Sequence, residues 1–503
     1  MNIMKIKILT SLFFLLLSLS VKSQIAFTKE VISSTGGFPY VIDSGQLSND
    51  LIGGEYYNDI VVGTDGGSTV EYYKNLDASP MRFDSGTALS YGTGAELSCV
   101  DGIHIADINN DDLNDVIATG YCNDRLVWFE NNGDGTFADS VLITTTSTLN
   151  GPGTVTSANL DNDVNGYQDL VVVIYGPDDN TDSVIFLIGD GTGGFTSEGF
   201  IVPETAGIGP SDIDLKDFDG DGDIDAVVSF ADSGDVYVYD NNLAAPGGTV
   251  SFTEYSNVVD GTNGYVFSVT FGDVNNDTQL DVVVVDNSPG ANPRVAWYAP
   301  TFSPSTPTNP ADDTTFTENI VATANDRPAR AIIANINNDM TGYNDIVISN
   351  ANTAPFDITW RRGNNMAPPN EFDTEETVDA TQASVYGITI NDFDNDGFLD
   401  IGSISALTNQ VSWFLNDGNT LSSEDNLILT ENISIYPNPA TNQLNFRGNF
   451  NSDLEVSVYD VLGKRIINKT VKYGQSLDVS KLNNGLYIIK FEGYDNTYKF
   501  VKN

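Results

Sequence analysis

A nine-residue acidic stretch recurs along this chain at a nearly constant interval, and that interval constrains the fold more than any local pattern. Its fullest copy runs from Asp217 to Asp225, carries carboxylates at alternate positions and is followed by the apolar run Ala226–Val228. The seven copies end at Asp59, Asp115, Asp169, Asp225, Asp281, Asp345 and Asp400. These aspartates are separated by 56, 54, 56, 56, 64 and 55 residues, a regularity that predicts a repeat architecture.

Each repeat contains the same order of short β-type runs. One run enters the acidic stretch, and a β-branched run such as Val282–Val285 leaves it. A third run carries aromatic residues, and a fourth often begins at phenylalanine. Four antiparallel strands joined by glycine-rich turns are typical of one blade of a β-propeller. All four tryptophans fall in third runs, which indicates packing between blades: Trp128, Trp297, Trp360 and Trp413.

The two ends of the repeat region complement each other. Residues 26–32 resemble a fourth strand with no blade before it, whereas the seventh repeat reaches its third run at Trp413–Asn416 and has no convincing fourth. The N-terminal strand can therefore complete the seventh blade and remove the open sheet edges. An open β-solenoid, the alternative, would not need this complementarity. We predict an all-β fold with a seven-bladed β-propeller over residues 24–427.

Residues 1–23 and 428–503 differ from the repeats in composition. Lys5 and Lys7 precede the apolar run Ile8–Leu19, which predicts a secretory signal peptide over residues 1–23; a buried N-terminal helix is the alternative. Residues 428–503 lack the acidity of the repeats and contain several short strand-like runs, which predicts a small β-sandwich. No other segment reaches transmembrane length, so none is expected in the mature chain.

The charge of the chain bounds its function. The sequence holds 70 acidic and 22 basic residues, for a formal net charge of −48. Nucleic acids and anionic lipid surfaces both require a basic surface, so neither is an expected partner. The single histidine, His104, argues against a His-clustered zinc site and a Ser-His-Asp triad. Carboxylate pairs for glycoside hydrolysis carry no signal in so acidic a chain.

The acidic stretches have the composition of calcium-binding loops, because calcium takes about six to eight oxygen ligands. Four repeats place Asp or Asn at positions one, three, five and nine: Asp107, Asn109, Asp111 and Asp115; Asp217, Asp219, Asp221 and Asp225; Asp273, Asn275, Asp277 and Asp281; Asp392, Asp394, Asp396 and Asp400. The backbone carbonyl at position seven is a further expected ligand. Gly222 and Gly397, at position six, allow a sharp turn. These are not EF-hands, because position twelve lacks the bidentate glutamate.

Three repeats depart from this spacing. Two of them begin with Asn and have two extra residues before the last Asp, so weaker calcium binding is expected from Asn159, Asp161, Asp163 and Asp169 and from Asn335, Asn337, Asp339 and Asp345. The first repeat has Leu51 and Gly53 where the first two ligands should be, and no metal is expected there. A turn rich in Asn and Asp is the alternative for any single loop. Because the loops recur around the ring, calcium is expected to be structural rather than catalytic.

Two further features lie outside the acidic loops. Cys99 and Cys122 form either a disulfide or two buried thiols; a hairpin with residues 106 and 116 facing each other would place residue 100 opposite residue 122. The loops from fourth strands to first strands are expected to help form any binding face. They contain Phe38, Tyr40, Tyr265, Arg327, Arg330 and Tyr386, with ordinary loop residues as the alternative interpretation.

The repeats resemble the FG-GAP/VCBS family, which includes the integrin α-chain propeller. The resemblance covers residues 24–427 and rests on the four complete acidic loops and on the segment Trp128–Phe137. It implies calcium binding by the Asp and Asn residues of those loops. It implies no single activity, because the fold hosts adhesion modules, lectin-like binders and some polysaccharide lyases.

The tail, from Tyr436-Pro437-Asn438-Pro439 to Lys502, resembles a type A sorting domain of the type IX secretion system. This resemblance implies export across the outer membrane, with release or attachment at the cell surface. We therefore predict a secreted or cell-surface, Ca²⁺-binding β-propeller that acts as a binding or adhesion module. Its expected partners are the type IX secretion machinery and an extracellular glycan or protein ligand. An extracellular polysaccharide lyase or hydrolase built on the propeller is the alternative.

Overall fold

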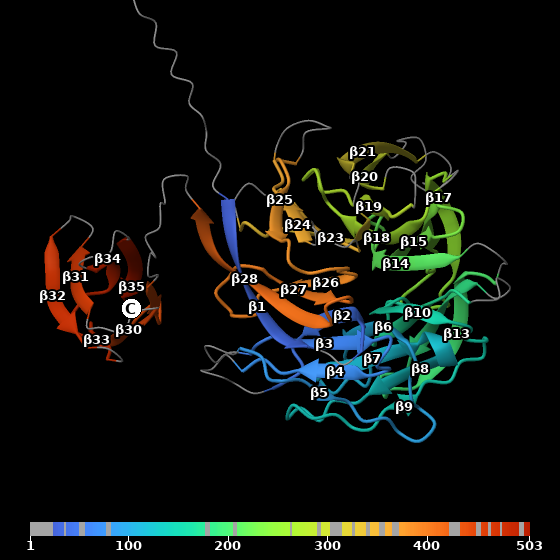
Figure 1. Cartoon of the computed structure of the whole chain (residues 1–503), viewed down its shortest axis with the longest axis horizontal. Helices are drawn as coiled ribbons and strands as arrows, with labels where there is room; N and C mark the ends of the chain where they lie inside the picture. The colour runs from blue at the N-terminus through green and yellow to red at the C-terminus, as the bar shows by residue number, and fades with distance from the viewer. Residues whose placement is uncertain are drawn as a thin grey trace, which may run out of the picture. The chain divides into compact units, whose positions relative to one another are not determined.

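β-Strands make up almost all of the regular structure of this protein (Figure 1). A computed structural model describes residues 24–34, 37–49, 56–76, 82–176, 182–204, 209–261, 264–288, 293–301, 314–323, 327–338, 343–351, 358–364, 372–421, 433–448, 454–460, 464–472, 475–491 and 497–502. The predicted signal peptide, residues 1–23, lies outside these residues. The chain divides into two units, one of which is Ser23–Leu421 while the other contains Ser422–Asn503.

Within its described residues, the first unit contains seven four-stranded antiparallel sheets. Their innermost strands are β2 (Pro39–Gly45), β6 (Val100–Ala106), β10 (Pro152–Ala158), β14 (Pro210–Lys216), β18 (Val266–Gly272), β22 (Pro328–Ala334) and β26 (Gly387–Asn391). The second strands are β3 (Asp59–Thr64), β7 (Asp115–Gly120), β11 (Asp169–Ile174), β15 (Asp225–Phe230), β19 (Asp281–Asp286), β23 (Asp345–Asn350) and β27 (Asp400–Ser405). Each second strand thus begins at the last aspartate of an acidic stretch.

The outer half of each sheet carries the aromatic and phenylalanine-led runs. The third strands are β4 (Val70–Tyr73), β8 (Arg125–Phe129), β12 (Ser183–Gly189), β16 (Val236–Asn241), β20 (Arg294–Thr301), β24 (Ile358–Arg361) and β28 (Gln410–Leu421). The outermost strands are β5 (Thr87–Ala88), β9 (Val141–Leu142), β13 (Phe195–Val202), β17 (Phe252–Val259), β21 (Thr315–Thr323), β25 (Glu376–Asp379) and β1 (Gln24–Ser34). One short 3₁₀ turn, η1 (Tyr121–Asn123), follows β7.

The sheets close into a ring. The innermost strand of each sheet contacts that of the next sheet, and β26 contacts β2 (Figure 1). The N-terminal strand β1 pairs antiparallel with β28, so it is the outermost strand of the sheet formed by the last repeat. Lys29 Nζ ties β1 to the preceding sheet through a 2.8 Å hydrogen bond to Asp379 Oδ2. The predicted β-propeller and its closure by the N-terminal strand are confirmed.

The core lies between neighbouring sheets. Most second strands, such as β7 and β11, are buried at every residue, which explains why they are continuous apolar runs in the sequence. The four tryptophans lie in third strands and are at most 7% exposed. Trp297, for example, packs with Val283 of its own sheet and Ile346 of the next. The tryptophans therefore hold blades together, as predicted.

Six innermost strands contain a register shift near their first residue. The shifts lie at Pro39–Val41, Val100–Gly102, Pro152–Val155, Pro210–Asp212, Val266–Ser268 and Pro328–Arg330. A β-bulge redirects a side chain out of the alternation of the strand, and bulges are frequent next to binding sites. All six shifts lie at the end of the ring opposite the acidic stretches.

Cys99 and Cys122 form a disulfide with a Cα–Cα distance of 5.4 Å, which decides between the two alternatives. The predicted hairpin register was wrong, because the turn is one residue shorter. Ala106 faces Asp115, and the bulge in β6 then places Val100 opposite Gly120. The disulfide joins the residue before β6 to the turn after β7, at the bulged end of this hairpin.

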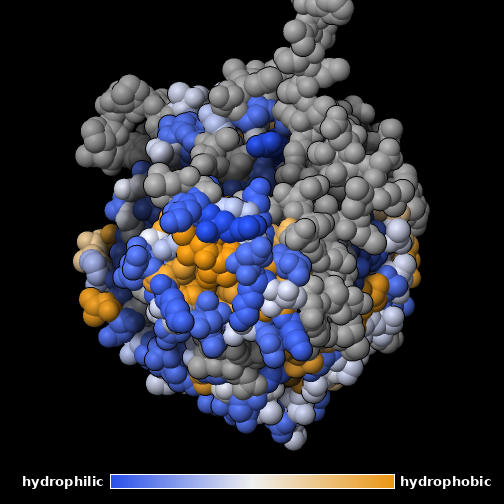
Figure 2. Space-filling model, turned by 90° about the vertical axis from the view of Figure 1, so that its left-hand side faces the viewer, coloured by the Kyte–Doolittle hydropathy of each residue, from blue (hydrophilic) through white to orange (hydrophobic). Residues whose placement is uncertain are grey.

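The second unit folds into two sheets around one apolar core. The smaller sheet contains β29 (Ile433–Tyr436), β30 (Gln443–Gly448) and β33 (Leu477–Asp478), and the larger contains β31 (Leu454–Asp460), β32 (Arg465–Val471), β34 (Gly485–Phe491) and β35 (Thr497–Lys502). Leu444, Val456, Ile489 and Phe500 lie in the core. Among the described residues of this unit, the exposed large apolar side chains are Tyr436, Ile466, Leu486 and Val501. Figure 2 shows, on one face of the molecule, an apolar patch ringed by hydrophilic side chains.

None of the described residues forms a helix with the length and apolar character needed to cross a membrane.

Candidate functional site

The acidic stretches form the turns between innermost and second strands, at one end of the ring. In the four complete loops, position six has a positive φ: 66° at Asp112, 99° at Gly222, 72° at Thr278 and 91° at Gly397. Glycine adopts this conformation freely, whereas another residue does so at a cost of about 1–2 kcal/mol. The sharp turn predicted from Gly222 and Gly397 is therefore present even where the sequence has no glycine.

The loop side chains turn inward and accept hydrogen bonds from the backbone of their own loop. Asp392 Oδ2 accepts from Gly397 N at 2.9 Å, and Asp396 Oδ1 accepts from Phe398 N at 2.9 Å. In the other three complete loops the N–H group at position six likewise donates to the aspartate at position one; these donors are Asp112, Gly222 and Thr278. These bonds gather the side-chain oxygens at the centre of each turn.

Two of the complete loops bring three carboxylates together. The ligand oxygens of Asp217, Asp219 and Asp225 lie within 4.8 Å of one another, as do those of Asp392, Asp394 and Asp400. Two oxygens on opposite sides of a calcium ion, each about 2.4 Å from it, would be about 4.8 Å apart, so both groups fit this ion. Asp219 and Asp221 also approach Asp240 of β16 within 4.8 Å, a neighbour that the loop spacing did not reveal.

The aspartate at position nine has a structural role besides any metal contact. Asp225 is 1% exposed, and its two oxygens accept from Phe218 N at 2.8 Å and Asn241 N at 3.0 Å. Burial, with a contribution from nearby loop carboxylates, raises the pKa of Asp225 to about 8 and that of Asp400 to about 8. A cation in the loop would offset this by favouring the ionised form.

Sequence reasoning missed a partner of this aspartate. Asn75, Asn131, Asn241 and Asn416 each follow the last aspartate by 16 residues, and their N–H groups bind its Oδ1. Their side-chain amides donate to backbone carbonyls of a neighbouring repeat, as from Asn416 to Ile336 O at 2.8 Å. The recurrence of Asn at this spacing was the available signal. These residues connect four of the acidic turns to the preceding blade of the ring.

The loops whose spacing differs from that of the four complete loops also differ in structure. Asp163 Oδ1 accepts from three successive N–H groups, those of Asn165, Gly166 and Tyr167, and is occupied by them. In the other loop the side-chain amide of Asn337 donates to Asp345 Oδ1 at 3.2 Å. Asp339, Leu51 and Gly53 lie outside the described residues, so their predicted roles stay predictions. Asp59 accepts N–H groups from Leu47, Ser48 and Asn75.

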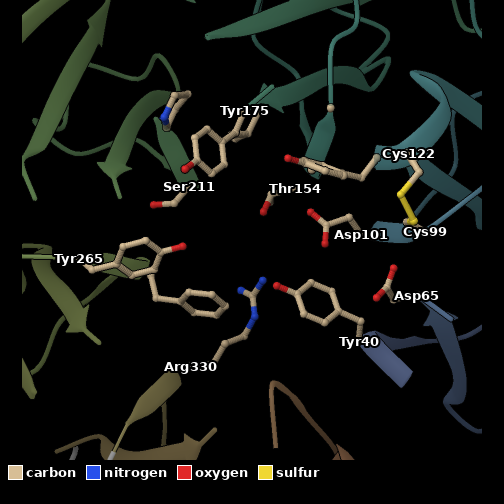
Figure 3. A pocket seen from close by; sticks show the side chains of 16 residues that line it. Tyr40, Asp65, Cys99, Asp101, Cys122, Thr154, Tyr175, Ser211, Tyr265 and Arg330 are labelled. Atoms are coloured by element: carbon tan, nitrogen blue, oxygen red, sulfur yellow. A yellow bond between two sulfur atoms is a disulfide. The ribbon is translucent and has the colours of Figure 1, made fainter. Parts of the chain in front are cut away.

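A pocket of about 540 Å³ lies at the opposite end of the ring, on its axis (Figure 3). Six innermost strands contribute to it at or next to their bulges, with side chains that include Tyr40, Asp101, Thr154, Ser211, Phe267 and Arg330. Because these strands form the closed inner ring, only the axis can be reached from all of them. The volume is in the range of small-molecule and cofactor sites.

Several polar groups of this pocket converge on its open space. Among the described residues, the hydroxyls of Tyr40, Tyr121 and Tyr265 and the carboxylates of Asp65 and Asp101 make no hydrogen bond to another protein group. Figure 3 shows the Tyr265 hydroxyl and the Asp101 carboxylate directed toward the middle of the pocket. A few convergent polar groups in a concave site lined by aromatic rings are typical of a site for a polar ligand.

Aromatic rings form a continuous wall beside these groups. Tyr386 contacts Tyr40, with ring centres 5.2 Å apart, and Phe267, with ring centres 6.3 Å apart. Tyr265 stacks on Phe267 at 6.4 Å, and Phe38 lies 6.5 Å from Tyr386. Phe38 has a φ of 44°, which is strained for a bulky residue. Such strain is often found at ligand sites.

Two carboxylates, Asp65 and Asp101, and one guanidinium, Arg330, are the charged groups among the described residues that line the pocket. Burial and the nearby Asp65 raise the pKa of Asp101 to about 7, while Arg330 acts in the opposite direction. Burial also raises the pKa of Tyr40 far above its usual value. Arg330 Nη1 lies 3.4 Å from Asp212 Oδ2, a carboxylate that is only 3% exposed.

The sequence anticipated part of this pocket. Of the six residues expected on the binding face, Tyr40, Tyr265 and Arg330 line it, and Phe38 and Tyr386 belong to the adjoining aromatic wall. Arg327 does not line it, because its Nε donates instead to Asn287 Oδ1 at 2.9 Å. Asp65, Asp101, Tyr121, Tyr175 and Phe267 were missed. Proline at the start of β2, β10, β14 and β22 marks equivalent positions and was a usable signal.

His104 lies below the pocket, within the inner ring. Its Nε2 is 2.9 Å from Ser157 Oγ, while its Nδ1 is 3.8 Å from Asp43 Oδ2. Ser157 in turn donates to Gln168 Oε1 at 3.0 Å. Because the Ser157 hydroxyl donates its hydrogen bond to Gln168, its oxygen accepts one from His104 Nε2. In a serine nucleophile the hydrogen bond runs the other way, from the serine hydroxyl to the histidine. Burial lowers the pKa of His104 to about 4, so the ring is neutral.

Comparisons with known proteins agree with the two resemblances. Residues 217–284 match the family model of the FG-GAP-like repeat, and residues 434–503 match that of the secretion system C-terminal sorting domain. The first match contains two complete acidic loops. The second indicates that the chain is secreted by the type IX system and reaches the cell surface.

A search of curated proteins returned no significant match. Among solved structures, a lectin from Agrocybe aegerita that recognises non-reducing terminal N-acetylglucosamine is similar, with a TM-score of 0.43 and 17% sequence identity. That alignment covers 68% of this chain and 81% of the lectin chain.

Proposed function

We propose that this protein is a secreted binding module whose propeller is stabilised by calcium and holds an extracellular glycan in its axial pocket. The observation that carries the proposal is the convergence of unpaired polar groups against aromatic rings. Carboxylates such as Asp65 and Asp101 can accept two sugar hydroxyls at once, and the C–H face of a sugar can stack on a ring such as Tyr265.

A protein ligand is less well supported than a glycan. A stable protein interface buries about 800 Å² on each partner, much of it on open surface. The free groups here lie inside a cavity of about 540 Å³, which suits one or two sugar units. A glycan chain can place such a unit in the pocket while its neighbours lie along the wall of Phe38 and Tyr386.

The test is retention of the purified propeller on a panel of extracellular polysaccharides. Tyr265→Ala should reduce retention, because it removes both a stacking ring and a free hydroxyl. Tyr56→Ala is the matched control, since Tyr56 is 46% exposed and lies in the turn of the first repeat that ends at Asp59, at the other end of the ring. Equal retention of both variants and the unmodified chain would place the ligand elsewhere.

Calcium in the acidic loops is the second part of the proposal. We assign the ion to the Asp and Asn side chains at positions one, three, five and nine of the four complete loops, with weaker sites in the two departing loops. The converging oxygens of Asp217, Asp219 and Asp225 support this assignment. Excess chelator should lower the melting temperature strongly, and an unmoved transition would contradict it.

A polysaccharide hydrolase or lyase is the second candidate. Asp101 favours it, because its pKa of about 7 lets a carboxyl carry a proton at neutral pH, as a general acid must. Asp65 is a second carboxylate beside it. Polymers retained by the protein should therefore also be scored for new reducing and unsaturated ends; their appearance, and their loss in Asp101→Asn, would establish an enzyme.

A further inference from the structure

Arg330 is the only cationic side chain among the described residues that line the axial pocket. It follows the bulge at Pro328–Arg330 in the innermost strand β22. Figure 3 shows its guanidinium between the rings of Tyr40 and Tyr265, facing the open space. Its side chain is 35% exposed, so the charged group is accessible from the pocket.

The hydrogen-bonding capacity of Arg330 is mostly unused. A guanidinium has five N–H donors. Only one bond from this group to the described residues is present, from Nη1 to Asp212 Oδ2 at 3.4 Å, near the long limit for such a bond. Asp212 is also shared, because it accepts from Val269 N at 3.2 Å and from Thr154 Oγ1 at 3.3 Å. The remaining donors of Arg330 therefore make no hydrogen bond to a described protein group and are available to a ligand in the pocket.

We propose that the glycan in the axial pocket carries an acidic group, a carboxylate or a sulfate, and that Arg330 binds this group. The inference rests on the proposed function of the pocket as a glycan site. A planar guanidinium matches two oxygens of a carboxylate or sulfate at once, and such paired, charge-assisted bonds are among the strongest that a side chain makes. The rings of Tyr40 and Tyr265 on either side would hold the sugar that carries the acid.

The acids of the pocket are compatible with an acidic ligand. Asp65 and Asp101 lie on the wall next to the disulfide, whereas Arg330 comes from β22. Burial and Asp65 raise the pKa of Asp101 to about 7. When this carboxyl is protonated, it does not repel an acidic ligand and can donate a hydrogen bond to it.

Binding of three polymers distinguishes the possible sources of the acid: polygalacturonate for carboxylate, dextran sulfate for sulfate, and dextran as the neutral counterpart of dextran sulfate. The full-length protein and its Arg330→Gln, Arg330→Lys and Arg327→Gln variants are compared by affinity electrophoresis and calorimetry. Arg327→Gln is the matched control, because Arg327 is bonded to Asn287 and does not line the pocket. Melting temperatures check that each variant is folded.

We expect one or both acidic polymers to bind at least tenfold more tightly than dextran. Arg330→Gln should lower that affinity tenfold or more, and Arg330→Lys should lower it less, because lysine keeps the charge and loses the planar fork. Arg327→Gln should bind as the unmodified chain does. Equal binding by Arg330→Gln, or equal binding of dextran and both acidic polymers, would overturn the inference while leaving a glycan site. Retention of no polysaccharide in the wider panel would instead overturn the proposed function.

Discussion

The two ends of an acidic loop should respond differently to substitution, and Asp217 and Asp225 provide the clearest pair. Asp217, at position one, bonds only to the backbone of its own exposed turn, to Gly220 N at 2.8 Å and Gly222 N at 3.2 Å. Asp225, at position nine, is buried and accepts two N–H groups of the core, those of Phe218 and Asn241. Both are assigned as ligands of the same ion.

The expected free energies of unfolding follow from these contacts. A site that is half-saturated at a tenth of the ambient calcium concentration contributes about 1.4 kcal/mol, and either alanine substitution should remove that stabilisation when calcium is present. In excess chelator, Asp217→Ala should be nearly neutral. Asp225→Ala should still cost about 2–6 kcal/mol, because it leaves two buried N–H groups without an acceptor at about 1–3 kcal/mol each.

Urea unfolding followed by tryptophan fluorescence, with calcium and with excess chelator, measures all four values. Asp59→Ala is a control, because Asp59 also binds core N–H groups but its repeat lacks the first two ligands; its cost should not depend on calcium. A cost of Asp217→Ala that is the same in calcium and in chelator would refute its assignment as a ligand. A neutral Asp225→Ala in chelator would refute the structural role of position nine.

Three further predictions concern the turn, the disulfide and the pocket. Thr278→Gly should stabilise the protein by about 1 kcal/mol in urea unfolding, because Thr278 has a φ of 72° that only glycine adopts freely; an unchanged or lower midpoint would contradict this. Replacing Cys99 and Cys122 by serine should lower the free energy of unfolding by about 3 kcal/mol, since their disulfide closes a loop with a sequence separation of 23. The same replacement should weaken polysaccharide retention, because both cysteines line the pocket. Unchanged retention at a temperature where the variant is folded would show that the disulfide does not shape the site. Binding of an acidic polymer should weaken up to about tenfold as the pH rises from 6 to 8. Burial and Asp65 raise the pKa of Asp101 to about 7, against the effect of Arg330, so the carboxyl becomes an anion over this range. Asp101→Asn should flatten this pH dependence, and an equally steep profile in that variant would assign the pH dependence to another group.

The repeat architecture could be predicted because each blade carries its own copy of the signal. The acidic stretch fixes the start of every second strand, from Asp59 to Asp400, so its period counts the sheets. The closure by β1 followed from a missing fourth strand in the last repeat. The hairpin register near Cys99 was predicted wrongly, because a bulge in β6 and a turn one residue shorter leave no mark in an apolar run.

The axial pocket was harder to predict for the opposite reason. Its groups occur once each, and Tyr40, Asp101, Ser211, Phe267 and Arg330 come from five different repeats. They meet because bulges at equivalent positions turn them toward the axis, which is a property of the closed ring and not of any one repeat. Arg327 and Arg330 look equivalent in the sequence. The structure distinguishes them, because Arg327 bonds to Asn287 away from the pocket whereas Arg330 lines it.

A crystal structure of the full-length protein with a bound oligosaccharide, taken from whichever polymer is retained best, is the most direct test of a glycan site on the axis of the ring. We expect electron density in the axial pocket, with the sugar in contact with Tyr265 and Asp101 and an acidic substituent on Arg330. A sugar bound on the outer strands or at the acidic loops, with the axial pocket filled only by water, would contradict it.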